Sequence, residues 1–324
     1  MKARTRWLLA CACALAPPAQ AQDTAQPYPA RAIRIIVPFP AGGTADLLPR
    51  IIAEKLSANW GQPVIVDNRA GAAGNIGAAM VFNAEPDGYT LLSAPPPPLV
   101  INQSLYPKLA FDPARFVPVT VMAAVPNVML LNAKMPVSNV RELIAWAKAN
   151  PEGLIYSSQG SGTTSHLTTE MFKSAAGALK ATHVPYKGTA PALGALLAGE
   201  VNLMFDNLGV SLQHVRSGRL KALAVCSERR VASLPDVPAM TETYPGFVSV
   251  AWFGVVAPPQ TPARIAARLN QAIVEALKLP DVGKRLGELS AEPVGNTPAQ
   301  MAAFMKVDAQ RWRSVIRAAN VTLD

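Results

Sequence analysis

The sequence predicts an α/β protein whose sheets are mainly parallel and covered by helices on both faces. From Ile33 onward, short runs rich in β-branched residues alternate with segments of helical spacing. Parallel strands need a connection long enough for a helix, so this alternation indicates parallel sheets with helices packed on them. Half of the 324 residues are hydrophobic and 16% are charged, which supplies a core for one large domain or two lobes.

The first 21 residues are predicted to be a signal peptide. A positively charged start is followed by the apolar run 7–15 and by the small-residue cleavage pattern Ala19-Gln20-Ala21. The apolar run is shorter than the ~20 residues that span a bilayer. The alternative, a lipoprotein signal read at Cys11, would shorten the apolar run severely. We therefore expect an exported, periplasmic protein whose mature chain begins near Gln22.

Charge and cysteine content narrow the function classes. Removal of three of the 30 basic residues with the signal peptide leaves 27 against 21 acidic residues. The basic residues are scattered, so nucleic acid is not an expected partner. The surplus of basic residues either creates an electric field that attracts small anions or only keeps the protein soluble, and both roles remain open. Cleavage leaves Cys226 as the single cysteine, and its apolar neighbours "LKALAV" predict a buried side chain without a disulfide.

Three strands and two helices are predicted in the first part of the chain. The strands are "IRIIVPF", "PVIVDN" and "GYTLLSA". The first helix carries apolar residues at helical spacing from Leu48 to Leu56, and the second is the small-residue segment "GAAGNIGAAMVF". If Asp46 caps the first helix, Pro49 falls on its third helical residue, where a missing N–H is harmless.

The rest of the chain continues the alternation and then changes character. Four further strands are predicted at "LIYSS", "HVPYKG", "VNLMFDN" and "LKALAV". The segments 117–132 and 246–259 are extended without helical spacing, so we expect them to cross between two lobes. Two later helices begin near Pro262 and Pro298, the second with a capping box, and they pack back on the first lobe. The last helix is expected to direct these side chains toward a core: Met301, Phe304, Met305, Trp312 and Ile316.

Three turns share one construction, in which a strand leads through small residues into a helix. They lie at 38–50, 157–172 and 186–200. Each presents unpaired amides and the positive end of a helix dipole at the carboxyl edge of a sheet. One helix terminus contributes ~0.3–1 kcal/mol to anion binding, whereas micromolar affinity needs about −8 kcal/mol. Several charge-assisted hydrogen bonds in a closing cleft are therefore required, and a donor set of amides and hydroxyls with few arginines favours a small carboxylate over a phosphate ester.

Enzymatic alternatives lack their motifs. No phosphate-binding loop or dinucleotide fingerprint occurs, and the three histidines show no metal-ligand spacing. Ser161 has glycine on both sides, but a nucleophile elbow needs glycine two residues away on each side, and residue 159 is glutamine. His166 is expected to be a polar cap or pocket wall. Asp206 either orients a ligand or forms an Asx-turn with Asn207, and both readings stay open. We expect no catalysis, no cofactor and no metal.

These motifs resemble those of the Bug-type extracytoplasmic solute receptors of tripartite tricarboxylate transporters. The resemblance runs from about Tyr28 to the C-terminus and rests on "YPARAIRIIVPFPAGGTADLLPR", "VDNRAGAAGNIGA", "PDGYTLL", "LYPKLAFDP", "GSGTTSHLTTEMF", "HVPYKGTAPAL" and "LMFDNL". It implies a two-lobe type II periplasmic binding protein, a Venus flytrap that closes on small carboxylates. It also implies a monomer that delivers its ligand to integral-membrane permease subunits. The alternative is a subunit of the same fold that signals to a membrane sensor kinase.

The resemblance also implies lobe boundaries and a set of ligand-binding residues. Lobe one comprises 22–124 and 250–324, and lobe two comprises 125–249. The loop 40–46 of lobe one and the loop 159–166 of lobe two grip the ligand from opposite sides, with Asp206 on a third wall. The expected ligand-binding residues are Phe39, Ala41, Gly42, Gly43, Asp46, Ser93, Gln159, Gly160, Ser161, Gly162, Thr163, Thr164, Ser165, His166, Lys187 and Asp206.

The chain departs from this family pattern at two places. Pro95 to Pro98 stand where relatives usually carry small hydroxyl or glycine residues. Prolines donate no backbone hydrogen bond and favour a stiff extended path, so a ligand carboxylate finds fewer donors there. The identity of the ligand therefore does not follow from the resemblance. The second departure is Pro49, at a position where relatives usually carry alanine.

Overall fold

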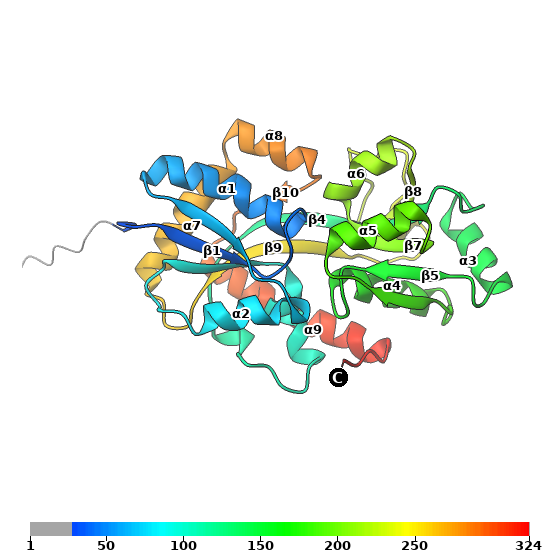
Figure 1. Cartoon of the computed structure of the whole chain (residues 1–324), viewed down its shortest axis with the longest axis horizontal. Coiled ribbons are helices and arrows are strands. Elements are labelled where there is room, and N and C mark those ends of the chain that lie inside the picture. The colour runs from blue at the N-terminus through cyan, green and yellow to red at the C-terminus, as the bar shows by residue number, and fades with distance from the viewer. Residues whose placement is uncertain (1–27, 324) are drawn as a thin grey trace, which may run out of the picture.

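One sheet connects the two halves of the protein (Figure 1). The structure is a computed structural model that describes residues 28–323, so the predicted signal peptide lies outside the described residues. The strands of the first half are β1 (Ile33–Val37), β2 (Val64–Asn68), β3 (Thr90–Ala94), β9 (Val250–Ala257) and β10 (Glu292–Pro293). Those of the second half are β5 (Ile155–Ser158), β6 (Thr182–Pro185), β7 (Leu203–Asn207) and β8 (Leu220–Val225), and β4 (Val117–Asn132) belongs to both.

The strand order is β2-β1-β3-β9-β4-β7-β5-β6, with β8 and β10 also paired to β4. The pairs that β1 makes with β2 and β3, and that β5 makes with β6 and β7, are parallel, as the alternation of strands and helices predicts. The strands that cross between the halves pair antiparallel with their neighbours. The result is a mixed sheet whose parallel parts lie away from the crossing.

Strand β4 is the longest strand and it changes partners along its length. Its first part pairs with β9 as far as Pro126 opposite Val250. From Asn127 onward it pairs with β7 and β8. The Asn127 side chain, fully buried, donates to Ser249 Oγ at 2.8 Å and accepts from Asn207 Nδ2 at 3.0 Å. A buried polar network therefore holds the two crossing strands together where the sheet passes from one half to the other.

Helices cover both faces of the first half, which forms lobe one (Figure 1). Side chains of α1 (Thr44–Trp60), α7 (Ala263–Leu277) and α8 (Pro280–Glu288) share one core cluster with one face of the sheet. Side chains of α2 (Asn75–Phe82), α9 (Pro298–Ala318) and the helical turn Pro97–Ile101 share a second cluster with the other face. Strand β9 alternates between them, because Phe253 and Val255 belong to the first cluster and Trp252 and Val256 to the second.

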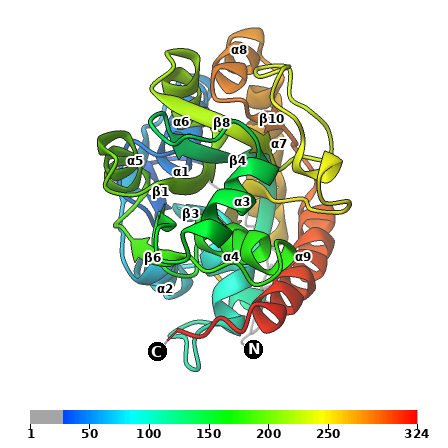
Figure 2. The same ribbon diagram turned by 90° about the vertical axis from the view of Figure 1, so that its right-hand side faces the viewer.

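Lobe two has the same layered arrangement. Helices α3 (Val140–Ala149) and α4 (Thr164–Ala175) pack on one face of its sheet, and α5 (Thr189–Ala198) and α6 (Leu208–Arg216) pack on the other. Cys226 is buried in the first of these cores, as predicted, and burial raises the pKa of its thiol. Short helical turns occupy Ala72–Gly74, Asn102–Ser104, Pro113–Arg115 and Met240–Glu242. Figure 2 shows the C-terminal part of α9 beside α4, so the last helix of lobe one also contacts lobe two.

The capping box predicted before the last helix is confirmed. Gln300 N–H donates to Thr297 Oγ1 at 3.2 Å, and Thr297 N–H donates to Gln300 Oε1 at 2.9 Å. One of the apolar side chains assigned to the core of this helix is not buried: Phe304 is 40% exposed, because it lies on the flank of α9 against the edge of Trp252. The other four are buried.

Two local predictions are wrong at proline positions. Gly43, not Asp46, is the N-cap of α1, so Asp46 is the third helical residue and Pro49 lies inside the helix. The prolines after β3 do not continue an extended path, since Pro96 has helical φ/ψ of −50° and −35° and leads into the turn Pro97–Ile101. The N–H groups in the first turn of a helix have no intrahelical hydrogen-bond acceptor, so consecutive prolines are tolerated there.

Candidate functional site

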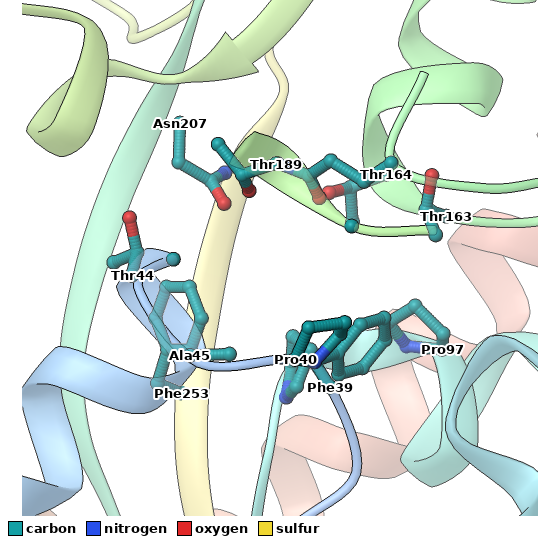
Figure 3. A pocket seen from close by; sticks show the side chains of 14 residues that line it. Phe39, Pro40, Thr44, Ala45, Pro97, Thr163, Thr164, Thr189, Asn207 and Phe253 are labelled. Atoms are coloured by element: carbon teal, nitrogen blue, oxygen red, sulfur yellow. The ribbon is translucent and has the colours of Figure 1, made fainter. Parts of the chain in front are cut away.

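A small pocket lies between the two lobes, where the carboxyl ends of several strands meet (Figure 3). Ligands of α/β sheets bind at this edge, since the strand-to-helix turns converge there. Lobe one and lobe two contribute about equally to the pocket wall. The lining residues are Phe39, Pro40, Gly43, Thr44, Ala45, Pro95, Pro97, Gln159, Thr163, Thr164, Gly188, Thr189, Asn207 and Phe253.

Four helices begin at this pocket. Their N-cap residues Gly43, Thr163, Gly188 and Asn207 are the caps of α1, α4, α5 and α6, and all four line the cavity. Within residues 28–323, none of these four caps makes a side-chain hydrogen bond to its own helix, whereas Asn139 and Thr297 cap α3 and α9 in that way. No side chain of these caps occupies the first-turn amides, although the Asp46 amide of α1 bonds back to Gly43 O at 2.9 Å, and four helix dipoles point their positive ends at the cavity.

The lobes approach each other closely at two glycines. A Cβ atom added at Gly43 would lie 3.1 Å from Thr189 Oγ1, and one added at Gly188 would lie 3.0 Å from Pro40 Cγ. Gly188 also has a φ of +98°, which side-chain-bearing residues rarely adopt. The close approach of the lobes therefore leaves little room for a side chain at Gly43 and, together with the positive φ, favours glycine at Gly188, one position on each side of the pocket.

The pocket contains polar side-chain atoms that the protein does not satisfy. The Thr44 hydroxyl is buried without a hydrogen-bond partner among residues 28–323, and the residue is 1% exposed. In the described part of the chain, no hydrogen bond reaches the hydroxyls of Thr164 and Thr189 either. Figure 3 shows Thr44 on the lobe-one side and Thr164, Thr189 and Asn207 opposite it. Because native proteins rarely leave buried polar atoms unpaired, the Thr44 hydroxyl indicates that a polar ligand completes the site, and the Thr164 and Thr189 hydroxyls are free to bind the same ligand.

Asp206 lies behind the pocket wall and holds Gln159, which lines the cavity. Gln159 Nε2 donates to Asp206 Oδ1 at 2.5 Å, and the other oxygen of this fully buried carboxyl has no partner among the described residues. Burial raises the pKa of Asp206 to about 7, against the smaller opposing effects of the Gln159 side chain and the Asn207 amide. At neutral pH this carboxyl is therefore close to half protonated, which lowers the negative charge facing an anionic ligand.

Replacing Asp206 by asparagine is expected to change the pH dependence of stability. The folded protein keeps the Asp206 proton up to about pH 7, whereas the unfolded chain loses it near pH 4, so stability contributed by this group is lost as pH rises between these values. As pH rises from 5 to 8, the free energy of unfolding of the variant should therefore rise by about 3 kcal/mol relative to that of wild type. Urea unfolding of the ligand-free protein measures this difference.

Comparison of the Asp206 variant with wild type separates the effect of Asp206 from that of His166 and His183. Burial lowers the pKa of His166 to about 4 and that of His183 to about 3, so their contribution has the opposite sign and is lost on acidification. Wild type and the Asp206 variant share this histidine contribution, so it cancels in the difference between their free energies of unfolding. The exposed Asp236 changed to asparagine is the control and should give a curve parallel to wild type. Parallel curves for the Asp206 variant would contradict the assignment.

His166 supports the second loop without lining the pocket. Gly162 N–H donates to His166 Nδ1 at 3.1 Å, which requires this nitrogen to be unprotonated. The ring stacks on His183 with centroids 4.1 Å apart, and His183 Nε2 is 2.7 Å from Ser158 Oγ. The sequence separation of these histidines gave no sign of this contact. The neutral His166 therefore acts as an acceptor that fixes the turn before α4.

Asp46 is likewise turned away from the cavity. Its carboxylate accepts from Gly42 N–H at 3.0 Å, from Arg50 Nε at 2.9 Å and from Asn68 Nδ2 at 2.9 Å. Burial alone would raise the pKa of Asp46, but these hydrogen bonds and the Arg50 charge outweigh it and hold the pKa below its usual range. The Gly42 amide is thus already occupied, and Gly42 and Ala41 lie exposed at the rim.

The expected ligand-binding residues divide into two groups. Those that line the pocket are Phe39, Gly43, Gln159, Thr163 and Thr164. Those that the structure places outside its lining are Ala41, Gly42, Asp46, Ser93, Gly160, Ser161, Gly162, Ser165, His166, Lys187 and Asp206.

Sequence reasoning did not select several residues that line the pocket. From the third turn it chose Lys187, which is exposed, whereas the adjacent Gly188 and Thr189 line the cavity. The position of that turn after a strand and before a helix was the available signal. Phe253 carried no such signal, because it lies in the middle of a buried strand. Pro40, Thr44 and Ala45 belong to the loop 40–46 that was expected to grip the ligand, although they were not among the individually expected residues. The other lining residues that were not expected are Pro95, Pro97 and Asn207.

Two further properties concern residues 28–323 only. No helix in this part is both long enough and apolar enough to span a bilayer. Nor does this part bring together three histidine, cysteine, aspartate or glutamate side chains that could hold a metal ion.

The fold and the pocket define a class. Two α/β lobes, joined by long crossing strands and enclosing a polar pocket at their strand ends, form a periplasmic solute-binding protein. The chain belongs to the receptor family of tripartite tricarboxylate transporters, since the family described as "Tripartite tricarboxylate transporter family receptor" matches residues 48–321.

Individual relatives agree with this family. Protein BugT of Bordetella pertussis is 40% identical over 303 residues, which cover 93% of each chain. A solved R. palustris protein with adipate is 38% identical, with a TM-score of 0.88 over 91% of this chain and 99% of the other. MatC from Rhodopseudomonas palustris with bound malate is 32% identical, with a TM-score of 0.84 over 89% of this chain and 100% of the other.

Proposed function

We propose that this receptor binds a small carboxylate in the pocket between its lobes and delivers it to the integral-membrane permease of a tripartite tricarboxylate-type transporter, without catalysing a reaction. The observation that carries the proposal is the convergence of four uncapped helix N-termini on one cavity with a buried, unpartnered Thr44 hydroxyl. The adipate and malate held by solved relatives are of the same chemical class.

A carboxylate suits the donors better than a phosphate ester. The lining residues include no lysine, arginine or histidine, so no side-chain cation is available to neutralise a second negative charge. Amide and hydroxyl hydrogen bonds to a charged group contribute about 1.5–3 kcal/mol each, and micromolar binding needs about −8 kcal/mol. Four or five such bonds, made in a pocket that excludes water, are sufficient.

The proposal includes the arrangement of the chain around the ligand. Lobe one is assigned to 22–124 with 250–324 and lobe two to 125–249, so that closure is a movement about β4 and the segment before β9. The exported protein acts as a periplasmic monomer after cleavage near Ala21. The residues proposed to contact the ligand directly are Phe39, Gly43, Thr44, Gln159, Thr163, Thr164, Thr189 and Asn207.

Replacing Thr44 by valine tests the pocket. Valine has nearly the same shape but no hydroxyl, so binding of the carboxylate should weaken about 10-fold to 100-fold, as for the loss of one charge-assisted hydrogen bond. The ligand-free variant should unfold at the same or a higher temperature, because the hydroxyl has no partner to lose. A thermal-shift panel of carboxylates that includes adipate and malate identifies the ligand, and calorimetry gives the Kd.

Thr44→Ser is the matched control, since it keeps the hydroxyl and should bind within about threefold of wild type. Equal affinity of the valine variant would exclude Thr44 from the ligand site. A panel in which no carboxylate stabilises the protein would refute the proposed function itself.

A further inference from the structure

The two walls of the pocket differ in chemistry. Figure 3 shows Asn207, Thr189, Thr164 and Thr163 along the lobe-two side, and Phe253, Ala45, Pro40, Phe39 and Pro97 along the lobe-one side. The lining residues contain no ionisable side chain. Hydrogen-bond donors are therefore concentrated on one wall, to which lobe one adds only the α1 N-terminus at Gly43 and Thr44.

The prolines after β3 are the reason for this asymmetry. A helical turn begins there at the pocket, and such a turn normally presents free N–H groups. Pro95 and Pro97 line the cavity and have no N–H, so their ring carbons face the ligand instead. Ser93 does not line the pocket, although its hydroxyl is buried and has no hydrogen-bond partner in the described part of the chain.

The α1 N-terminus belongs with the donors of lobe two. Gly43 lies so near Thr189 that a Cβ atom there would be 3.1 Å from Thr189 Oγ1. The N-termini of α1 and α5 therefore lie close enough across the narrow pocket for one carboxylate to contact both. Phe39, Pro97 and Phe253 remain as an apolar surface without a group that can receive a second charge.

We propose that this receptor selects a monocarboxylate with an apolar body over the dicarboxylates and tricarboxylates. The carboxylate lies at the helix N-termini of α1, α4 and α5, and the aliphatic or aromatic body packs on Phe39, Pro97 and Phe253. A second carboxylate against this wall is buried without a donor, which is strongly unfavourable. This inference rests on the proposed function, because it assigns the ligand class of the same pocket.

Ligand pairs that differ only in the second carboxylate test the selection. Hexanoate is compared with adipate, and benzoate with terephthalate, by calorimetry on the mature protein. We expect at least one monocarboxylate to bind at least tenfold more tightly than its dicarboxylate counterpart. The inference is overturned when adipate, terephthalate, malate or citrate binds more tightly than both monocarboxylates, and the proposed function then still stands. Both are overturned when none of these carboxylates binds.

A variant tests whether the prolines cause the selection. Pro97→Ala supplies an N–H in the first turn of the helical segment and removes part of the apolar wall, so the affinity for adipate relative to hexanoate should rise at least fivefold over wild type. Pro98→Ala is the matched control, since Pro98 is buried next to Pro97 but does not line the pocket. An unchanged adipate-to-hexanoate ratio in Pro97→Ala, or the same change in both variants, excludes the proline wall as the cause.

Discussion

Replacing Gly43 by leucine is expected to weaken carboxylate binding at least 100-fold while the protein remains folded. The backbone at Gly43 has φ −92° and ψ 171°, an extended conformation that any residue adopts without strain. The added side chain, however, projects toward Thr189 Oγ1, which would lie 3.1 Å from its Cβ atom. It therefore occupies the ligand space and holds the lobes apart. A 100-fold loss corresponds to about 2.7 kcal/mol.

The control for this prediction lies two residues away. Ala41 is exposed on the same loop, so Ala41→Leu adds the same bulk outside the pocket and should bind normally. Calorimetry with the best ligand of the carboxylate panel gives both affinities, and circular dichroism verifies the fold. The N-cap change itself should lower the free energy of unfolding by less than about 1 kcal/mol. Wild-type affinity in Gly43→Leu would show that the ligand does not bind between α1 and α5.

The largest stability effect is expected at Asp308, which lies far from the pocket lining. Its Oδ2 accepts from Trp252 Nε1 at 2.8 Å and from Trp312 Nε1 at 3.1 Å, and its Oδ1 accepts from Arg311 Nε at 2.9 Å. Both indole rings are buried, so Asp308→Leu leaves two N–H groups without an acceptor. At about 1–3 kcal/mol for each unsatisfied group, the free energy of unfolding should fall by about 3–5 kcal/mol.

Asp308→Asn separates this effect from a change in packing. Asparagine keeps one carbonyl oxygen at nearly the same place, so it should recover at least half of the loss seen with leucine. Urea unfolding followed by circular dichroism measures both variants. Carboxylate affinity should be unchanged in either variant, since Asp308 does not contact the pocket. Equal stabilities for the two variants would show that the indole hydrogen bonds contribute little.

Much of the fold follows from patterns that are local in the chain. Every strand expected before residue 226 is present, because runs such as "IRIIVPF" are too apolar for the surface and too short for a helix. The segment 117–132 forms one extended strand, β4, as expected. The capping box of Thr297 and Gln300 involves only two residues that are three positions apart, so the sequence alone was enough to identify it.

The errors occur where a side chain chooses among partners that are distant in sequence. Asp46 was considered both as the cap of α1 and as a ligand-binding residue, yet Asn68 and Arg50 hold its carboxylate beside the Gly42 amide. Lys187 was selected from the third turn, but the approach of Pro40 brings the adjacent Gly188 into the cavity instead. Neither Asn68 nor Pro40 has a local sequence relation to the residue that it affects.

The sequence by itself determined the strands and helices and the two crossings, and it predicted that helix N-termini bind an anion. These are consequences of periodicity, turn chemistry and the backbone geometry of neighbouring residues. Only the tertiary structure decided which amides remain free, that Thr44 and Thr189 face one cavity, and that prolines form its opposite wall. The physical reason is that a hydrogen-bond donor is available to a ligand only when the fold places no protein acceptor next to it. Such competing acceptors come from residues that are distant in sequence.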